Sequence, residues 1–187
     1  MRMAGALIVV LSLQPFAVVS ATSCQAWCNH WTCYNDAKML DAKCADCTRC
    51  KVQTYVIQET PQSWAASREE CVNRGGQLAA VLTEQQNAAI REAADDLGEN
   101  GNIWIGGTDN TAFGSPGEGT FVWVDYDDGN GNNYVAGGNA YDAWGNGQPN
   151  DGGNNVAQDC IRMSRDGSWN DKKCTDKYPS VCALVDG

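Results

Sequence analysis

The sequence predicts a domain of mixed helices and strands, stapled by disulfides, with a small cysteine-rich module before it. Three observations support this prediction. The ten cysteines fall into a crowded group at 24–50 and a dispersed group at 71–182. Beyond Lys51, a strand-like segment is followed by two segments with helix N-cap residues, of which the second has apolar residues at helical spacing. A long stretch rich in Gly and Asn then occupies residues 127–155.

Length and charge exclude several classes of protein. The chain has 187 residues, which suffices for one ordinary domain and a small module. Its 23 Asp and Glu against 13 Lys and Arg give a net charge of -10. Because binding to a phosphate backbone or to anionic lipid requires positive charge on the binding face, we do not expect nucleic acid or a membrane surface as a partner. With 43% apolar and 19% charged residues, the chain has the composition of a globular protein.

Residues 1–21 have the composition of a signal peptide. Arg2 gives a positive start, an apolar run follows from Ala4 to Val19, and the small residues that end in Ala21 favour cleavage after that position. A transmembrane anchor is the alternative, but the apolar run is shorter than the ~20 residues that span a bilayer. No later segment of the sequence approaches a spanning length. We therefore expect a secreted, extracellular protein without membrane insertion.

The six crowded cysteines define a module at 22–51. In an oxidising compartment cysteines pair as disulfides, and a stretch this short needs such staples because it cannot bury a sufficient core. A zinc site is the alternative by ligand type, and its ligands would be Cys44, Cys47, Cys50 and His30.

The cysteine order C-x3-C-x4-C-x10-C-x2-C-x2-C, which begins at Cys24, resembles the ShK-type toxin module. The resemblance implies the disulfides Cys24–Cys50, Cys28–Cys44 and Cys33–Cys47. Lys38-Met39 stands where such toxins carry the lysine and tyrosine that plug potassium channels. We therefore expect a stapled spacer or docking module and not a channel blocker.

A strand and a helix are expected directly after the module. Residues 52–57 are good strand formers, and the strand is expected to end at Pro61. Ser63 can cap a helix that begins at Trp64. This helix is expected to stop before Gly75-Gly76, because glycines supply the left-handed residues that a helix end prefers.

A second helix and two short strands come next. Thr83 and Gln86 form a capping box, and Ile90, Ala94 and Leu97 share one face of the helix that follows. Two apolar strands are expected at 103–105 and 121–124. Eight Gly and eight Asn lie among residues 127–155, and a loop this long in a compact domain is usually functional.

Beyond the module, the order and spacing of the motifs resemble the C-type lectin domain over about residues 52–185. The matching motifs are Trp64 to Cys71, Gly75-Gly76-Gln77-Leu78-Ala79, Trp104-Ile105-Gly106-Gly107, Phe121-Val122-Trp123, Trp144 with Gln148-Pro149-Asn150, Asp159-Cys160, Trp169-Asn170-Asp171, Cys174 and Val181-Cys182. The resemblance implies an α+β fold with two helices, antiparallel sheets and a long loop, and a core that buries Trp104 and Trp123. It also implies the disulfides Cys71–Cys182 and Cys160–Cys174.

The same resemblance implies a calcium and sugar site built from oxygen ligands, which calcium prefers. The implied ligands are Gln148, Asn150, Gln158, Asn170 and Asp171. It further implies a cis peptide bond before Pro149. The family's sugar binders usually carry Glu-Pro-Asn or Gln-Pro-Asp where this chain has Gln-Pro-Asn, and a Glu where this chain has Gln158.

These two glutamines predict a weak site. Among the five implied ligands only Asp171 is anionic, so the ligand set offers far less negative charge than the three carboxylates of a typical mannose-type site. We expect a calcium dissociation constant near the ~10⁻⁴ to 10⁻³ M of weak extracellular modules, or no calcium binding. Metal-bound amides also accept poorly from sugar hydroxyls, so monosaccharide binding should be weak and multivalent surfaces should be preferred. Positions where some family members hold further calcium ions fall near Asp109, Glu118, Asp151 and Asp159.

We therefore expect a carbohydrate-binding C-type lectin that recognises glycans on microbial or cell surfaces, with a role in innate defence by analogy with the family. The expected glycans are mannose-type, galactose-type or peptidoglycan. The alternative is a calcium-independent lectin-like domain that binds a protein ligand, which the two Gln substitutions favour. An enzyme is not expected, because the only His, His30, lies in the cysteine module and no pair of acids stands in an apolar setting.

Overall fold

The structure is a computed structural model that describes residues 53–95, 97, 101–127, 133–136, 141–153 and 157–185. The predicted signal peptide at 1–21 and the predicted six-cysteine module at 22–51, with His30, lie outside these residues. None of the described helices has the length and apolar character needed to cross a membrane.

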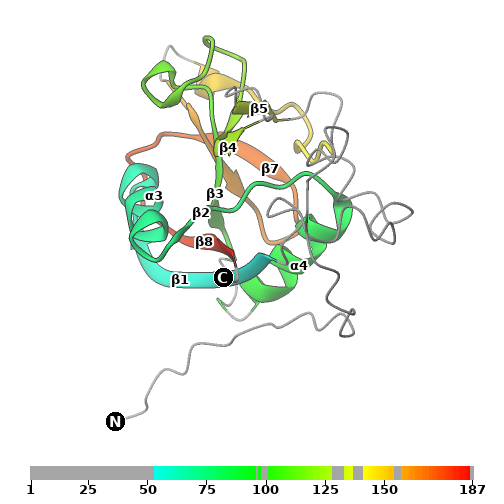
Figure 1. Ribbon diagram of the computed structural model, residues 1–187. Helices are drawn as coiled ribbons and strands as arrows, with labels where there is room; N and C mark the ends of the chain where they lie inside the picture. Colours follow the sequence, from blue (N-terminus) through cyan, green and yellow to red (C-terminus); the bar gives the residue numbers. More distant parts are fainter. Residues whose placement is uncertain are drawn as a thin grey trace, which may run out of the picture.

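A mixed sheet brings the two ends of the domain together. Its main path runs in the order β1-β8-β3-β4-β5, and β6 and β7 form a hairpin that pairs with β3 (Figure 1). Strand β8 is antiparallel to β1 and β2, and it meets β3 in parallel at Trp104 and Ser180. The strands are β1 (Gln53–Gln62), β2 (Gly76–Leu78), β3 (Ile103–Thr108), β4 (Val122–Asp127), β5 (Asn133–Val135), β6 (Cys160–Met163), β7 (Trp169–Lys172) and β8 (Tyr178–Val185).

The two predicted helices are confirmed. Helix α3 (Trp64–Asn73) begins after Ser63, whose side chain accepts from the Ala66 amide. Helix α4 (Glu84–Ala94) begins with the capping box of Thr83 and Gln86. Figure 1 shows the two helices at opposite ends of β1. Two short 3₁₀ turns, η3 (Thr111–Phe113) and η4 (Asp151–Gly153), complete the regular elements.

Two predicted boundaries are wrong. Strand β1 continues through Pro61 to Gln62, with a register shift after Gln58. A proline is tolerated there because β1 lies at the edge of the sheet, where its missing N–H costs no ladder hydrogen bond. Part of the predicted long loop forms strand β5, which pairs with β4 at Val122 and Val135. Pairing with the otherwise open edge of β4 outweighs the low strand preference of the surrounding Asn and Gly residues.

The core and the disulfides agree with the resemblance. Trp104 and Trp123 are both fully buried, on two different hydrophobic clusters. Cys71 on α3 is bonded to Cys182 on β8, with their Cα atoms 5.2 Å apart. Cys160 at the start of β6 is bonded to Cys174 in the turn after β7, with a Cα separation of 5.1 Å. The second disulfide fixes this turn against β6, next to the strand that carries Asn170 and Asp171.

Candidate calcium and glycan site

A buried carboxylate holds the loop that carries the Gln-Pro-Asn motif. Asp171, on β7, is 1% exposed. Its Oδ1 and Oδ2 accept from the Asn150 amide at 3.1 and 3.0 Å, and Oδ2 also accepts from the Asp151 amide at 2.6 Å. The Asn150 Oδ1 in turn accepts from the Gly152 amide at 2.8 Å. The peptide bond between Gln148 and Pro149 is cis, as the resemblance implies.

A hollow of about 260 Å³ lies beside this loop. Its walls are Asp109, Glu118, Gly119, Phe121, Pro149, Asn150, Asp151, Gln158 and Asp171. Three of the five predicted sugar-site residues therefore line one space, together with three of the four acids predicted as further calcium ligands. Gln148 and Asn170 are not among its lining residues.

Gln148 and Asn170 nevertheless keep free acceptors. The Oε1 of Gln148 and the Oδ1 of Asn170 are both buried, and neither has a hydrogen-bond partner among the described residues. A buried amide oxygen without a donor costs free energy, so such an atom calls for an explanation such as an absent ion or ligand.

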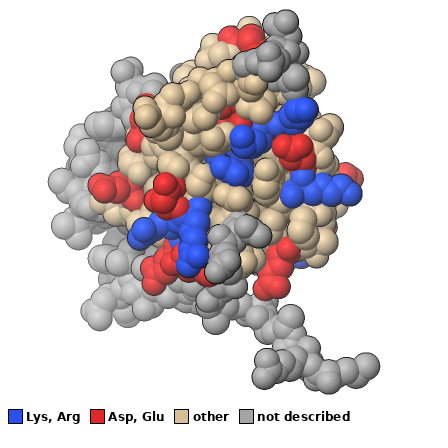
Figure 2. Space-filling model, turned by 180° about the vertical axis from the view of Figure 1, so that it is seen from behind, with Lys and Arg blue, Asp and Glu red and all other residues tan. Residues whose placement is uncertain are grey.

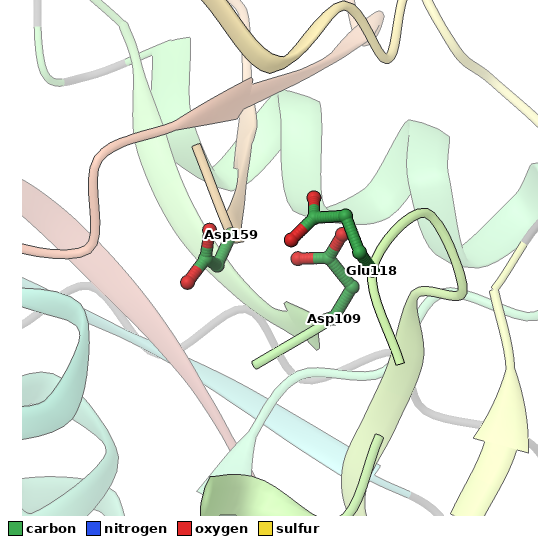
Figure 3. Close-up of side chains that lie close together, drawn as sticks. All are labelled: Asp109, Glu118 and Asp159. Carbon is green, nitrogen blue, oxygen red and sulfur yellow. The ribbon is translucent and has the colours of Figure 1, made fainter. Parts of the chain in front are cut away.

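Three carboxylates from separate segments lie close together beside the hollow, and two of them, Asp109 and Glu118, line it. Asp109 follows β3, Glu118 lies before β4, and Asp159 directly precedes β6. Figure 3 shows the carboxylates of Asp109 and Glu118 side by side, with that of Asp159 close to them. One oxygen from each carboxylate lies within 4.8 Å of the others. We call these three residues the acidic cluster.

Local hydrogen bonds position the acidic cluster. The Gly119 amide donates to Asp109 Oδ2 at 2.8 Å, which brings the Glu118 turn against the end of β3. The Asp109 amide donates to the Asp159 carbonyl oxygen at 3.1 Å. Two oxygens of the cluster, Asp109 Oδ1 and Asp159 Oδ1, are buried and have no donor within the described ranges.

The electrostatics of the acidic cluster favour a cation. Burial is the main cause that raises the pKa of Asp109, which is 3% exposed, and the charge of Asp159 adds to it. The charge of Asp109 is in turn the main cause that raises the pKa of Glu118. None of the three acids has an ion-pair partner in the described part of the chain. A cation between them would remove the repulsion between like charges.

The donor set of the acidic cluster fits calcium better than the predicted sugar-site set does. Carboxylate oxygens are the ligands that this hard cation prefers, and affinity rises with the charge of the ligands. The cluster offers three carboxylates, with Asp151 on the same hollow. Asp171 is the one carboxylate of the other set, and the loop amides already occupy its oxygens.

Some residues that contribute to the site were not predicted from the sequence. The Gly119 amide and the Thr108 hydroxyl, which donates to the Asp159 carbonyl oxygen at 2.5 Å, support the acidic cluster. Phe121 forms an apolar wall and packs against Trp144, with ring centroids 4.9 Å apart. For Gly119 and Thr108, adjacency to Glu118 and Asp109 is the signal that could have indicated them.

The chain belongs to the C-type lectin domain family. The model of the Lectin C-type domain matches residues 60–184, which include both disulfides, the Gln-Pro-Asn loop and the acidic cluster.

Known relatives agree with this assignment. Tetranectin from Mus musculus is 29% identical over 156 residues, which cover 80% of this chain and 68% of the relative. The galactose-specific lectin nattectin from Thalassophryne nattereri is 30% identical over 131 residues, which cover 69% of this chain and 72% of the relative.

Solved structures share the fold. The cow carbohydrate-recognition domain of CD23, solved in the presence of an oligosaccharide, matches with a TM-score of 0.57 and 24% identity, over 72% of this chain and 89% of that chain. A calcium-independent type II antifreeze protein matches with a TM-score of 0.54 and 24% identity, over 71% of this chain and 86% of that chain.

The role of the acidic cluster can be tested with Glu118→Gln. This substitution removes one of the three negative charges of the cluster and hardly changes the volume of the side chain. In chelator at pH 7, this variant should melt about 1–2 °C higher than the parent protein, because Asp109 loses its repelling neighbour. A carboxyl group whose pKa is raised by folding binds more protons in the folded state, so its destabilising effect is present at neutral pH and disappears as the pH falls. The advantage of the variant should therefore vanish toward pH 4.

Calcium should reverse the order of the two melting temperatures, so that the parent protein melts higher than Glu118→Gln. Its affinity for Glu118→Gln should be at least about tenfold lower, equivalent to ~1.4 kcal/mol, because a ligand charge is lost. Thermal melting with and without calcium measures both effects. Glu69→Gln, at an exposed position on α3, is the matched control and should change neither. A Glu118→Gln variant that resembled this control would contradict a shared cation site.

Proposed function

We propose that the protein is a secreted lectin that binds glycans on microbial or cell surfaces at the Gln-Pro-Asn loop, with calcium held by the acidic cluster. The observation that carries this proposal is the hollow that Asn150, Gln158 and Asp171 line together with Asp109 and Glu118 of the acidic cluster. The relative nattectin, a galactose-specific lectin by name, supports the choice of glycan as ligand.

In this proposal Asp109, Glu118 and Asp159 would hold calcium, which supplies positive charge that offsets their mutual repulsion. Asp151 links the cluster to the loop, because its Oδ1 accepts from the Gln158 amide at 2.9 Å and its own amide is bound to Asp171. The loop is thus fixed from two sides, by Asp171 and by the wall that carries the acids. A fixed loop loses less conformational entropy when a sugar binds.

The side-chain amides of the protein would then form the hydrogen bonds to the sugar. The side chains of Gln148 and Asn170 offer buried carbonyl oxygens that have no donor in the part of the chain that the structure describes, and both side chains also carry N–H groups. These groups can accept from and donate to vicinal hydroxyls of a hexose. Without carboxylates at 148 and 158, discrimination between sugars should be low, and affinity should come from many weak contacts on a multivalent surface.

A second candidate function is a calcium-independent domain that binds a protein ligand. One observation favours it: the three amide hydrogen bonds to Asp171 satisfy the carboxylate and shape the loop with groups of the chain alone. The calcium-independent antifreeze protein among the solved structures has the same fold, and fold alone does not decide function.

The proposal extends to the N-terminal segment. We expect cleavage after Ala21, secretion, and a module at 22–51 that is closed by three disulfides and acts as a spacer or docking unit. A role in innate defence would follow from the recognition of microbial glycans.

The direct test is retention of the full secreted chain on mannose, galactose and peptidoglycan resins, with calcium and with chelator. We expect retention on at least one resin, with partial or complete elution by chelator because calcium leaves the acidic cluster. Retention on none of the resins in either condition would contradict the lectin function and favour a protein ligand.

The weakness of the predicted sugar site can be tested with the double variant Gln148→Glu, Gln158→Glu. The change adds two carboxylates at nearly constant volume, so calcium affinity should rise by at least about tenfold, equivalent to ~1.4 kcal/mol. Mannose should gain more affinity than galactose, because the motif becomes Glu-Pro-Asn. Calorimetric titration with calcium, and then with each sugar, measures both effects.

Gln85→Glu is the control for charge, because Gln85 is exposed on α4 and the substitution adds one of the two negative charges away from the site. Asp171→Asn should weaken binding in the parent protein and in the double variant. If the double variant bound calcium no better than the Gln85→Glu protein, these glutamines would not be ligands.

A further inference from the structure

A second charged surface lies on the hairpin formed by β6 and β7. Strand β7 also carries Asn170. In the antiparallel register Arg162 is paired with Asn170, and Cys160 is paired with Lys172. Directly paired residues and next-but-one residues of a strand point to the same side, so Arg162, Asn170 and Lys172 share one side of the hairpin. The other side carries the buried residues Ile161, Met163, Trp169 and Asp171.

Two further lysines extend this surface along the turn from β7 to β8. Lys173 follows β7 and Lys177 precedes β8, and both are exposed. The Cys160–Cys174 disulfide holds the turn against β6. We call Arg162, Lys172, Lys173 and Lys177 the basic face. Figure 2 shows, on the side opposite to the view of Figure 1, an area in which Lys and Arg side chains gather around an acidic one.

The basic face is not neutralised by ion pairs. Arg68, Arg74 and Arg165 each have a carboxylate within 4.0 Å, whereas no described acid lies within this distance of any cation of the basic face. Asp166 and Asp176 are the acids of the same hairpin and turn. The Asp166 carboxylate already accepts from the amide and the hydroxyl of Ser168, at 2.9 and 2.6 Å.

Arg162 is held in a fixed position on the basic face. Its guanidinium lies over the Tyr178 ring at 5.6 Å from the centroid, and Tyr178 packs edge-on against the buried Trp104 at 4.9 Å. Its Nη2 donates to Ser164 Oγ at 2.9 Å. The Arg162 Nε is buried and lacks an acceptor within the described residues. A fixed guanidinium matches the planar geometry of a carboxylate and the oxygens of a sulfate.

We propose that the basic face binds the carboxylate or sulfate groups of an acidic polysaccharide whose adjoining sugar occupies the candidate glycan site. This inference rests on the proposed lectin function, because Asn170 belongs both to the predicted sugar-site residues and to the side of the hairpin that carries Arg162 and Lys172. A glycan that extends from the hollow to Asn170 would meet its register partner Arg162 and the other cations of the basic face, none of which has an ion-pair partner among the described residues.

Two arguments favour a polysaccharide over a nucleic acid. Among the described aromatic residues Tyr178 lies on this face, and it is half-buried, with Arg162 over its ring and Trp104 packed edge-on against it, so little of the ring is open for stacking a base. The net charge of -10 repels any polyanion at long range, so an acidic polymer needs a second contact, which a sugar at the candidate glycan site supplies and a nucleic acid lacks. Screening confines the attraction of the basic face to about 10 Å at ~0.1 M salt, so a polyanion gains from it only when another contact aligns the chain.

The test compares binding of the full chain to heparin, polygalacturonate and a neutral mannan at about 0.1 M salt, a concentration at which charges still interact over ~10 Å. Lys173→Glu, Lys177→Glu should weaken binding to the acidic polymer by at least about tenfold, equivalent to ~1.4 kcal/mol, and leave mannan binding unchanged. Arg74→Glu, Arg91→Glu changes the net charge equally at positions outside the basic face, and should alter neither. Preference for heparin or for polygalacturonate identifies sulfate or carboxylate as the group bound.

Several results would overturn the inference. Equal losses in the two double variants would show that net charge alone matters. An oligonucleotide that bound as tightly as the acidic polymers, with the same sensitivity to the lysine changes, would show a general polyanion site. Retention on neutral glycan without preference for acidic polymers would contradict this inference alone. Failure to bind every glycan would contradict the lectin function as well.

Discussion

The hydrogen bonds between the Asp171 carboxylate and the loop amides are the constraint on which the candidate site depends. A carboxylate that is 1% exposed must be satisfied by donors, because a buried charge without partners costs several kcal/mol. The amides of Asn150 and Asp151 provide these donors at 2.6 to 3.1 Å. The neighbouring core residue Trp169 donates to Asn87 Oδ1 on α4, at 2.9 Å, which ties the same strand to the helix layer. The position of the loop is therefore set by β7, which is itself fixed in the core.

This arrangement places the shaping of the loop and the clustering of carboxylates in different parts of the candidate site. The loop is shaped by Asp171 and by groups of the chain, whereas the strongest demand for a cation lies across the hollow at the acidic cluster. In the proposed sugar site, Gln148 and Gln158 supply amide groups that donate as well as accept, in place of negative charge. The proposed recognition of a glycan surface would draw on the amides of the loop and on the cations of the basic face.

Much of the fold could be predicted from the sequence, because its signals are local. The Ser63 cap and the Thr83 and Gln86 capping box both form as predicted, and the family motifs imply the two disulfides that the structure contains. Strand β5 and the passage of β1 through Pro61 were missed, because both depend on which edge of the sheet is free.

The site was predicted less completely, because its decisive contacts join distant segments. The motifs identified Asn150, Gln158 and Asp171 and the acids separately, but their meeting in one hollow depends on the packing of the β3 end against the β6 start. The basic face depends on the register that aligns Arg162 with Asn170. Sequence spacing alone carries no information on that register.

The most direct test of the central claim is amide hydrogen exchange at Asn150 and Asp151 in chelator. If the Asp171 carboxylate holds the loop without metal, both amides should be protected in the absence of calcium, and Asp171→Asn should remove the protection. Calcium should then add little at these two positions. Amides that exchanged freely in chelator and became protected on addition of calcium would show that the metal shapes the loop, and would contradict the account.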